Sequence, residues 1–502
     1  MNHHTLGAKL FEGLFKLPEQ VTPLKLSYEP DDYLCTWILP HGEGETIELP
    51  GNLKVLPMRP PTGVVYGSVP LESHSKGVFS FPQTVQVTAL TGIMANGGSV
   101  ILLDASITYW SMGKGHISGS AALLGHGRDI FGWPSSLKQL GRNTTPLVSS
   151  VKFQISALDA IIGTLPIKSV QTPGRHRENP TDLWSATVNL EASSRWETQE
   201  TSLHVGYDGR MNTAGGYEFT LAYSPVASFK INNHLPLRSV MDELVEPLRR
   251  IISISTGAPQ DLTYLSVELD SSRGAHQVFG TGITQNPFTS SSKDVRSKNS
   301  AILARADNLS LLDLVLKWRE YTAEHHPLVE TYGSMLHVAD QHPRSRFLLL
   351  IQALEGLHGH ETRDDFEERK QKHLLKRKSA IEAIEGKVDS ATLSYLKKSI
   401  SKSPPTSLES ALNATVQGLP VNTMDRLAKT ELVTDVMSQS PTPTTAASAL
   451  RVVRNNLAHG NRGYDAHELD EVVKILELIV RGHSLRILGC PESVVKRVFD
   501  RT

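Results

Sequence analysis

The hydrophobic and polar positions of this chain follow two different periods. From Leu26 to about Lys230, short apolar runs rich in Val, Ile, Thr and aromatic residues alternate with clusters of Gly, Pro, Asn or Asp. The runs include YLCTWIL, TVQVTAL, SVILLDASITYW, SVKFQISAL and YEFTLAYS, and turn signals recur about every 8 to 12 residues. This spacing predicts an antiparallel β-rich domain of the sandwich or barrel type.

The period changes from two to about 3.6 in PLRSVMDELVEPLRRIISISTGAP. One apolar stripe and a terminal Gly257 predict an amphipathic helix there. The stripe consists of Val240, Leu244, Leu248 and Ile251 or Ile252. Two further strand-like runs follow, LTYLSVELD and HQVFGTGIT, and the Ser- and Lys-rich TSSSKDVRSKNSA is the best linker candidate.

Beyond Asn308 the strand pattern disappears and helical periodicity takes over. The segments SLLDLVLKWREYTAEH and RSRFLLLIQALEGLHGHE read as helices, as do residues 445–459 and a final helix over about 465–484. These elements predict an all-α bundle of four or more helices. The expected fold is therefore α+β. We expect a β-rich domain over 1–235, a connecting region over 236–340 and a helical domain over 341–502.

Composition narrows the class of protein. Apolar residues make up 39% and charged residues 21%, which is ordinary globular composition. The 51 basic and 52 acidic residues nearly cancel, so any nucleic-acid site must be a local patch. Cys35 and Cys490 form no CxxC or Cys/His cluster, which argues against a zinc module, although a single bridge between them stays open. No signal peptide or bilayer-length apolar run is visible, so we expect a cytoplasmic protein without membrane contact.

The motif RVVRNNLAHG carries the candidate chemistry. Its Arg454 and His459 are five residues apart, a spacing that chance alone supplies roughly once in a chain with 20 His. About three pairs are expected if looser spacings are admitted, and REYTAEHH and RGYDAH are such decoys. The context is more specific, because an amphipathic helix precedes the His and Gly460 stands where a C′ glycine would end it. Asn455 and Asn456 are poor helix formers, so their presence suggests a polar function beside Arg454.

Helix geometry constrains how this pair can act. At 100° per residue, Arg454 and His459 point about 140° apart, whereas Asn455 and His459 share a face. A two-fold dimer would bring the two groups together more easily than one chain. Chemically, an imidazole can take the proton of a ribose 2′-OH while a guanidinium stabilises charge on the phosphate. Such a pair would cut RNA without a metal, leaving a 2′,3′-cyclic phosphate and a 5′-OH.

The motif and its flanking helices resemble the ApeA-like group of the HEPN superfamily. RNNLAHG matches the R-N-x-x-x-H form of the superfamily motif, and RFLLLIQALEGLHG and ELDEVVKILELIVRGHSL resemble helices of that group. FEGLFKLPE and SVKFQISALDAIIG are loosely similar to the ApeA N-terminal domain. The resemblance implies an anti-phage abortive-infection endoribonuclease that dimerises through the HEPN domain and cleaves host RNA such as tRNA. We expect the N-terminal domain to be regulatory, either as the sensor of a phage-derived trigger or as a block on the active site.

The resemblance assigns roles residue by residue. Arg454 and His459 carry over as the catalytic pair, with Asn455 and Asn456 as polar support. Glu355, in QALEG, matches a recurrent acidic position and is expected to orient Arg454. No cofactor and no metal are expected.

Each of these assignments has an alternative in which the residues have no function in catalysis or RNA binding. Arg454 and His459 could simply be cations at a solvated helix end. A basic run is a candidate for contacts with the RNA backbone, but such runs are usually a solvated helix face. The run contains Arg369, Lys370, Lys372, Lys376 and Arg377. The rival function is a non-catalytic HEPN-type module that binds nucleotides or a partner, with the β-rich domain as its recognition surface.

Overall fold

The chain folds into two compact units. The computed structural model describes residues 22–41, 45–67, 78–126, 145–171, 185–214, 218–270, 274–291, 300–335, 341–404, 407–439 and 445–500. The β unit comprises Met1–Ile252 and Gln260–Leu316, and the helical unit comprises Ser253–Pro259 and Lys317–Thr502. The connecting region expected over 236–340 thus contributes to both units, and the three-domain division stays a prediction. FEGLFKLPE and most of TSSSKDVRSKNSA lie outside the described residues.

Within the described ranges, the β unit contains a 13-stranded antiparallel sheet and a two-stranded ribbon. The sheet order is β11-β12-β13-β8-β14-β15-β7-β5-β4-β1-β2-β3-β6, and β9 pairs with β10 in the ribbon. The strands are β1 (Asp32–His41), β2 (Glu45–Lys54), β3 (Thr62–Tyr66), β4 (Gln83–Met94), β5 (Ser99–Ser111), β6 (Lys114–Ser118), β7 (Ala121–Gly125), β8 (Leu147–Ile155), β9 (Ile167–Gln171), β10 (Ser185–Val188), β11 (Ser194–Glu197), β12 (Thr201–Ala214), β13 (Glu218–Pro236), β14 (Leu262–Leu269) and β15 (Ala275–Gly280).

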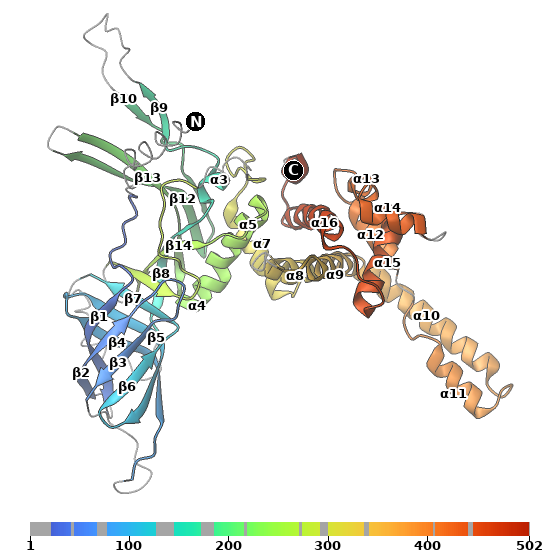
Figure 1. Ribbon diagram of the computed structural model, residues 1–502, viewed down its shortest axis with the longest axis horizontal. Coiled ribbons are helices and arrows are strands. Elements are labelled where there is room, and N and C mark those ends of the chain that lie inside the picture. Colours follow the sequence, from blue (N-terminus) through green and yellow to red (C-terminus); the bar gives the residue numbers. More distant parts are fainter. Residues whose placement is uncertain are drawn as a thin grey trace, which may run out of the picture. The chain divides into compact units, whose positions relative to one another are not determined.

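Six of these strands close into a barrel. The order β5–β4–β1–β2–β3–β6 returns to its start because β6 pairs with both β3 and β5. The blue strands of Figure 1 show this part of the unit. Trp37, fully buried, fills the interior, and its indole N–H donates to the Val64 carbonyl at 3.2 Å. Gly51 leaves room for it, since an added Cβ would lie 2.7 Å from Trp37 Cδ1. Closure pairs strand edges that an open sheet would expose.

A helical segment follows β13 and ends the β region, as the change of period predicts. It comprises α4 (Leu237–Val240), a π-helical turn, η2 (Met241–Val245), and α5 (Glu246–Thr256). Its predicted apolar stripe is buried. Gly257, with φ of 74°, follows α5. Arg481 of the helical unit donates to the carbonyls of Ile254 at 3.0 Å and Ser255 at 3.3 Å, so it caps the end of α5.

Beyond Asn308, the elements of the described residues are all helices. The short α3 (Leu158–Ile162) belongs to the β unit. The later helices are α7 (Leu311–Ala323), α8 (Pro327–Met335), α9 (Pro343–Glu361), α10 (Arg363–Ile384), α11 (Ser390–Ser399), α12 (Leu408–Gln417), α13 (Thr423–Ala428), α14 (Glu431–Gln439), α15 (Ala446–His459), α16 (Ala466–Ile487) and α17 (Glu492–Asp500). The α+β fold class, with an antiparallel β-rich region before a helical bundle, is confirmed.

Helix α9 is the centre of this bundle. It packs against α8, α12, α15 and α16. Its apolar residues at helical spacing are buried as predicted, namely Phe347, Leu350, Ile351, Leu354 and Leu357. One prediction was wrong, because the helix that begins near Asp465 is not the last. Gly489 and Pro491 end α16, and the further helix α17 buries Val494 and Phe499.

Two general expectations can be compared with the structure. Cys35 and Cys490 are both buried and form no disulfide, and burial raises the pKa of the Cys35 thiol to about 12. Among the described helices, none combines the length and apolarity needed to cross a bilayer.

Candidate functional site

Helix α15 carries the motif, and local sequence explains where it begins and ends. Thr445 accepts a hydrogen bond from the Ser448 backbone N–H, and the Ser448 side chain accepts from the Thr445 backbone, which forms a capping box. Leu450, Val453 and Leu457 are buried on one face. Gly460 ends the helix at φ of 70°. The predicted helix over 445–459 is therefore confirmed, with the motif on its last two turns.

Arg454 is held between two polar neighbours. Its Nη2 lies 3.5 Å from Glu355 Oε2 on α9, and its Nη1 donates to Asn455 Oδ1 at 3.2 Å. The side chains of Arg454 and Glu355 are 36% and 34% exposed, so water reaches the pair. A guanidinium has five N–H donors, so two such contacts leave donors for a phosphate. The structure thus brings together three of the residues singled out in the sequence.

His459 lies apart from this cluster. It is the last residue of α15 and is exposed. The helix stays regular up to His459, so the angle of about 140° between the two side chains still holds. In the described part of the chain, no hydrogen bond or ion pair joins Arg454 to His459. One chain by itself therefore presents the two groups in different directions.

Asn456 stabilises the turn after the motif. Its Nδ2 donates to the Tyr464 hydroxyl at 2.7 Å, and its carbonyl accepts from the Asn461 backbone N–H at 3.0 Å. Arg344, in the first turn of α9, donates to the Leu457 carbonyl at 2.6 Å and fixes the end of α15 from the other side. Sequence reasoning missed Tyr464 and Arg344. The only signal for Tyr464 was an aromatic residue in an otherwise polar turn.

A second His of this unit is inaccessible to substrate. His483 on α16 is 1% exposed, and its Nε2 lies 2.7 Å from the Thr415 carbonyl. Arg486 donates through Nε to His483 Nδ1 at 3.1 Å, and its Nη2 pairs with Glu361 of α9. Burial, with a smaller effect of the Arg486 charge, lowers the pKa of His483 to about 4. A neutral, buried imidazole with both nitrogens engaged is a structural group.

The basic run lies on α10, and much of its charge is balanced nearby. Lys370 pairs with Glu367 at 3.2 Å and Lys372 with Glu368 at 2.5 Å. The Arg369 guanidinium lies 5.9 Å from the centre of the Phe366 ring. Arg377 donates through Nε to the Ile400 carbonyl at 3.0 Å, while Lys376 is exposed. Arg377 therefore has a structural role, and contact of the basic run with RNA stays a prediction.

Among the residues that the structure describes, no group of three or more His, Cys, Asp or Glu side chains is arranged to hold a metal ion.

Comparison with known proteins bears on the helical unit. The sequence model of the Apea-like HEPN family matches residues 348–494, which include Glu355, Arg454 and His459. No curated protein and no solved structure matches the chain. The family match supports a defence-related HEPN domain of the nuclease type. The resemblance seen in the motif is thereby confirmed, since residues 348–494 of this chain match the model of the Apea-like HEPN family.

Proposed function

We propose that this chain is a metal-independent endoribonuclease that acts in defence against phage, with Arg454 and His459 as its catalytic pair. The observation that carries the proposal is the contact between Arg454 and Glu355, which sets a carboxylate of α9 against the motif arginine. Arg462, from the decoy pair RGYDAH, instead donates to Gln439 Oε1 at 2.7 Å. A guanidinium held at a solvent-accessible helix end can bind a phosphate and stabilise the charge that develops on it.

The reaction is cleavage of RNA by its own 2′-hydroxyl. The His459 imidazole takes the proton of the ribose 2′-OH, and the 2′-oxygen attacks the adjacent phosphorus. Arg454 stabilises the pentacoordinate phosphate while the bond from phosphorus to the 5′-oxygen breaks. The 5′-oxygen leaves and takes up a proton from water or from a second imidazole. The products are a 2′,3′-cyclic phosphate and a 5′-OH, and DNA is spared because it lacks the 2′-OH.

A homodimer through the HEPN domain completes this site. The regular α15 directs Arg454 and His459 about 140° apart, so one chain does not converge them on a single phosphate. A two-fold axis beside the helix end would bring the partner subunit's His459 toward Arg454. Asn455 supports the guanidinium, and Asn456 fixes the turn that carries the exposed helix end.

The family match supports a proposal for the substrate and its control. We propose host RNA, with tRNA as the preferred class, whose cleavage causes abortive infection. The β unit forms a separate compact body, which suits a regulatory role as the sensor of a phage-derived trigger.

The test compares variants in a cleavage assay that contains EDTA. Wild-type chain should cleave RNA to fragments with cyclic-phosphate ends. Arg454→Ala and His459→Ala should both abolish cleavage, since loss of a general base costs about 100- to 10,000-fold in rate. His467→Ala, from the decoy pair RGYDAH, is the matched control and should cleave normally. Wild-type rates in both motif variants would refute the assignment. Absence of cleavage with retained RNA binding would favour the non-catalytic alternative.

A further inference from the structure

The helical hairpin formed by α10 and α11 is basic from Arg369 onwards, after the acidic residues Asp364, Asp365, Glu367 and Glu368 at the start of α10. Residues 369–402 contain ten Lys or Arg and only three Asp or Glu, although the whole chain has 51 basic and 52 acidic residues. The excess of positive charge in this segment is therefore local. In Figure 1 the two helices run side by side, away from the other helices of their unit. Such a protruding basic element is accessible to a polyanion from several sides.

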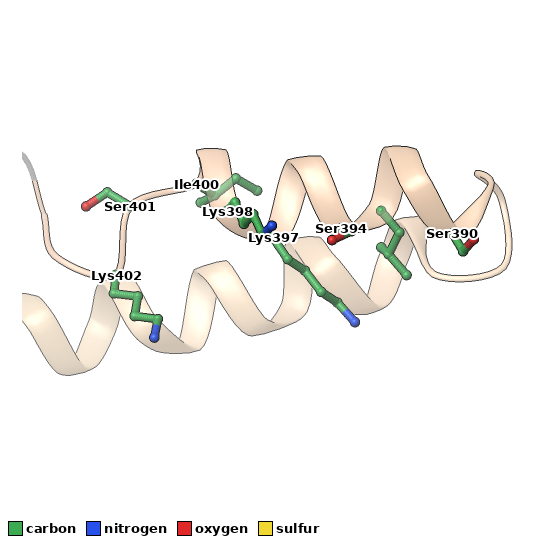
Figure 2. A pocket seen from close by; sticks show the side chains of 8 residues that line it. Ser390, Ser394, Lys397, Lys398, Ile400, Ser401 and Lys402 are labelled. Atoms are coloured by element: carbon green, nitrogen blue, oxygen red, sulfur yellow. The ribbon is translucent and has the colours of Figure 1, made fainter.

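One face of α11 forms a groove of about 670 Å³. The lining residues of the helix follow helical spacing of three and four, which places them on one face. They are Ser390, Leu393, Ser394, Lys397 and Lys398, and the next segment adds Ile400, Ser401 and Lys402. Figure 2 shows the Lys397 and Lys402 side chains extending to the same side of α11. The groove thus offers three amino groups and three hydroxyls above a small apolar floor.

The hairpin is held together by polar contacts more than by a core. Arg377 of α10 donates to the carbonyls of Lys397 and Ile400, and His373 Nε2 lies 3.0 Å from the Ser401 carbonyl. In α10 only Ile381 is buried, and α11 buries no side chain. Arg377 is thus used to fix the end of α11, which positions the three lysines of the groove.

RNA suits this surface better than other polyanions. The groove has no acidic lining residue, although Glu385 lies 3.3 Å from Lys397 at its border. Lysines act as point charges toward phosphates and read no sequence, which is typical of contacts to a nucleic-acid backbone. Tyr395 of α11 is 69% exposed, and an exposed aromatic ring can stack on an unpaired base.

We propose that the α10–α11 hairpin is an RNA-holding arm whose groove binds backbone phosphates through Lys397, Lys398 and Lys402. This inference rests on the proposed ribonuclease function and adds a binding surface away from the motif residues. It also changes the roles of the α10 residues that the sequence suggested as RNA contacts. Arg377 positions the groove, Lys370 and Lys372 are partly neutralised by their own helix, and α11 supplies the main contacts.

The experiment measures RNA binding by the full-length chain with His459→Ala, so that bound RNA stays intact. A labelled single-stranded RNA and a tRNA are titrated at several salt concentrations. The test variant adds Lys397→Ala, Lys398→Ala and Lys402→Ala. The control instead adds Lys429→Ala, Lys474→Ala and Lys496→Ala, which remove three exposed charges elsewhere in the helical unit. Unfolding curves check that both variants fold.

Loss of three phosphate contacts should make the slope of log K against log salt less negative by about two. By the same relation, affinity near 0.1 M salt should fall by up to about 100-fold. The control should bind as the parent does. Equal slopes and affinities in both variants would overturn the arm, and the ribonuclease assignment would still stand if the wild type cleaves RNA. If the parent binds no RNA at all, both the arm and the proposed function fail.

Discussion

Replacing Glu355 by Gln tests whether this carboxylate positions Arg454. The two side chains are about one-third exposed, and exposed ion pairs contribute about 0.2–1 kcal/mol to stability. Glu355→Gln keeps the shape of the side chain and removes its charge. We therefore expect the free energy of unfolding to fall by no more than about 1 kcal/mol. If Arg454 loses about 1 kcal/mol of its stabilisation of the transition state, the cleavage rate falls about five-fold.

A matched control lies on the same helix. Glu361 of α9 pairs with Arg486, and these side chains are 39% and 37% exposed. Glu361→Gln should change stability to a similar extent but leave cleavage unchanged. The assay is single-turnover cleavage at saturating RNA, beside urea unfolding of each variant. Equal cleavage rates for the two variants would show that Glu355 does not position Arg454, and partial recovery in Glu355→Asp would support its role.

Two further predictions concern stability. Because the pKa of His483 is lowered to about 4 from an ordinary value of 6.5, its neutral form stabilises the fold above pH 6.5, and this stability is lost as the pH falls toward 4. Between pH 7 and pH 5 the free energy of unfolding should fall by about 2 kcal/mol because of this histidine. In urea unfolding, the wild type should therefore lose about 2 kcal/mol more over this pH range than His483→Gln does. Parallel pH profiles for the two proteins would contradict the reasoning. Gly257→Ala should cost about 1–3 kcal/mol, because φ is positive and the new Cβ would lie 2.5 Å from Arg481 Nη1. Gly386→Ala is the control for backbone strain alone, because φ is 82° there and no atom lies within 4 Å of the added Cβ. An equal loss of stability in both variants would show that a clash with Arg481 contributes nothing.

The helix of the motif shows what could be predicted locally. Thr445 at the N-cap, the apolar spacing of Leu450 and Val453, and Gly460 at the end are all signals within one short segment. Each acts through a hydrogen bond or a backbone angle that involves residues at most a few positions apart. For the same reason the strand-rich pattern of the first half and the buried stripe of α9 were predicted correctly.

The barrel illustrates what local patterns leave open. Alternating residues predict strands, but the sandwich and the barrel share that pattern. Closure depends on β6 pairing with both β3 and β5, and on Trp37 fitting above Gly51. These contacts join segments that are distant in sequence. The helix α17 was missed because its short apolar pattern is stabilised by packing against α16.

The candidate site divides in the same way. The sequence by itself determined the helix, the order of polar groups on it and the direction in which Arg454 and His459 point, because the α-helix has a fixed angle per residue. Only the tertiary structure decided which groups surround them. Glu355 reaches Arg454, and Tyr464 reaches Asn456, because α9 and the turn before α16 pack against α15. Such pairings depend on how side chains fill the space between elements, and no period in the chain records that.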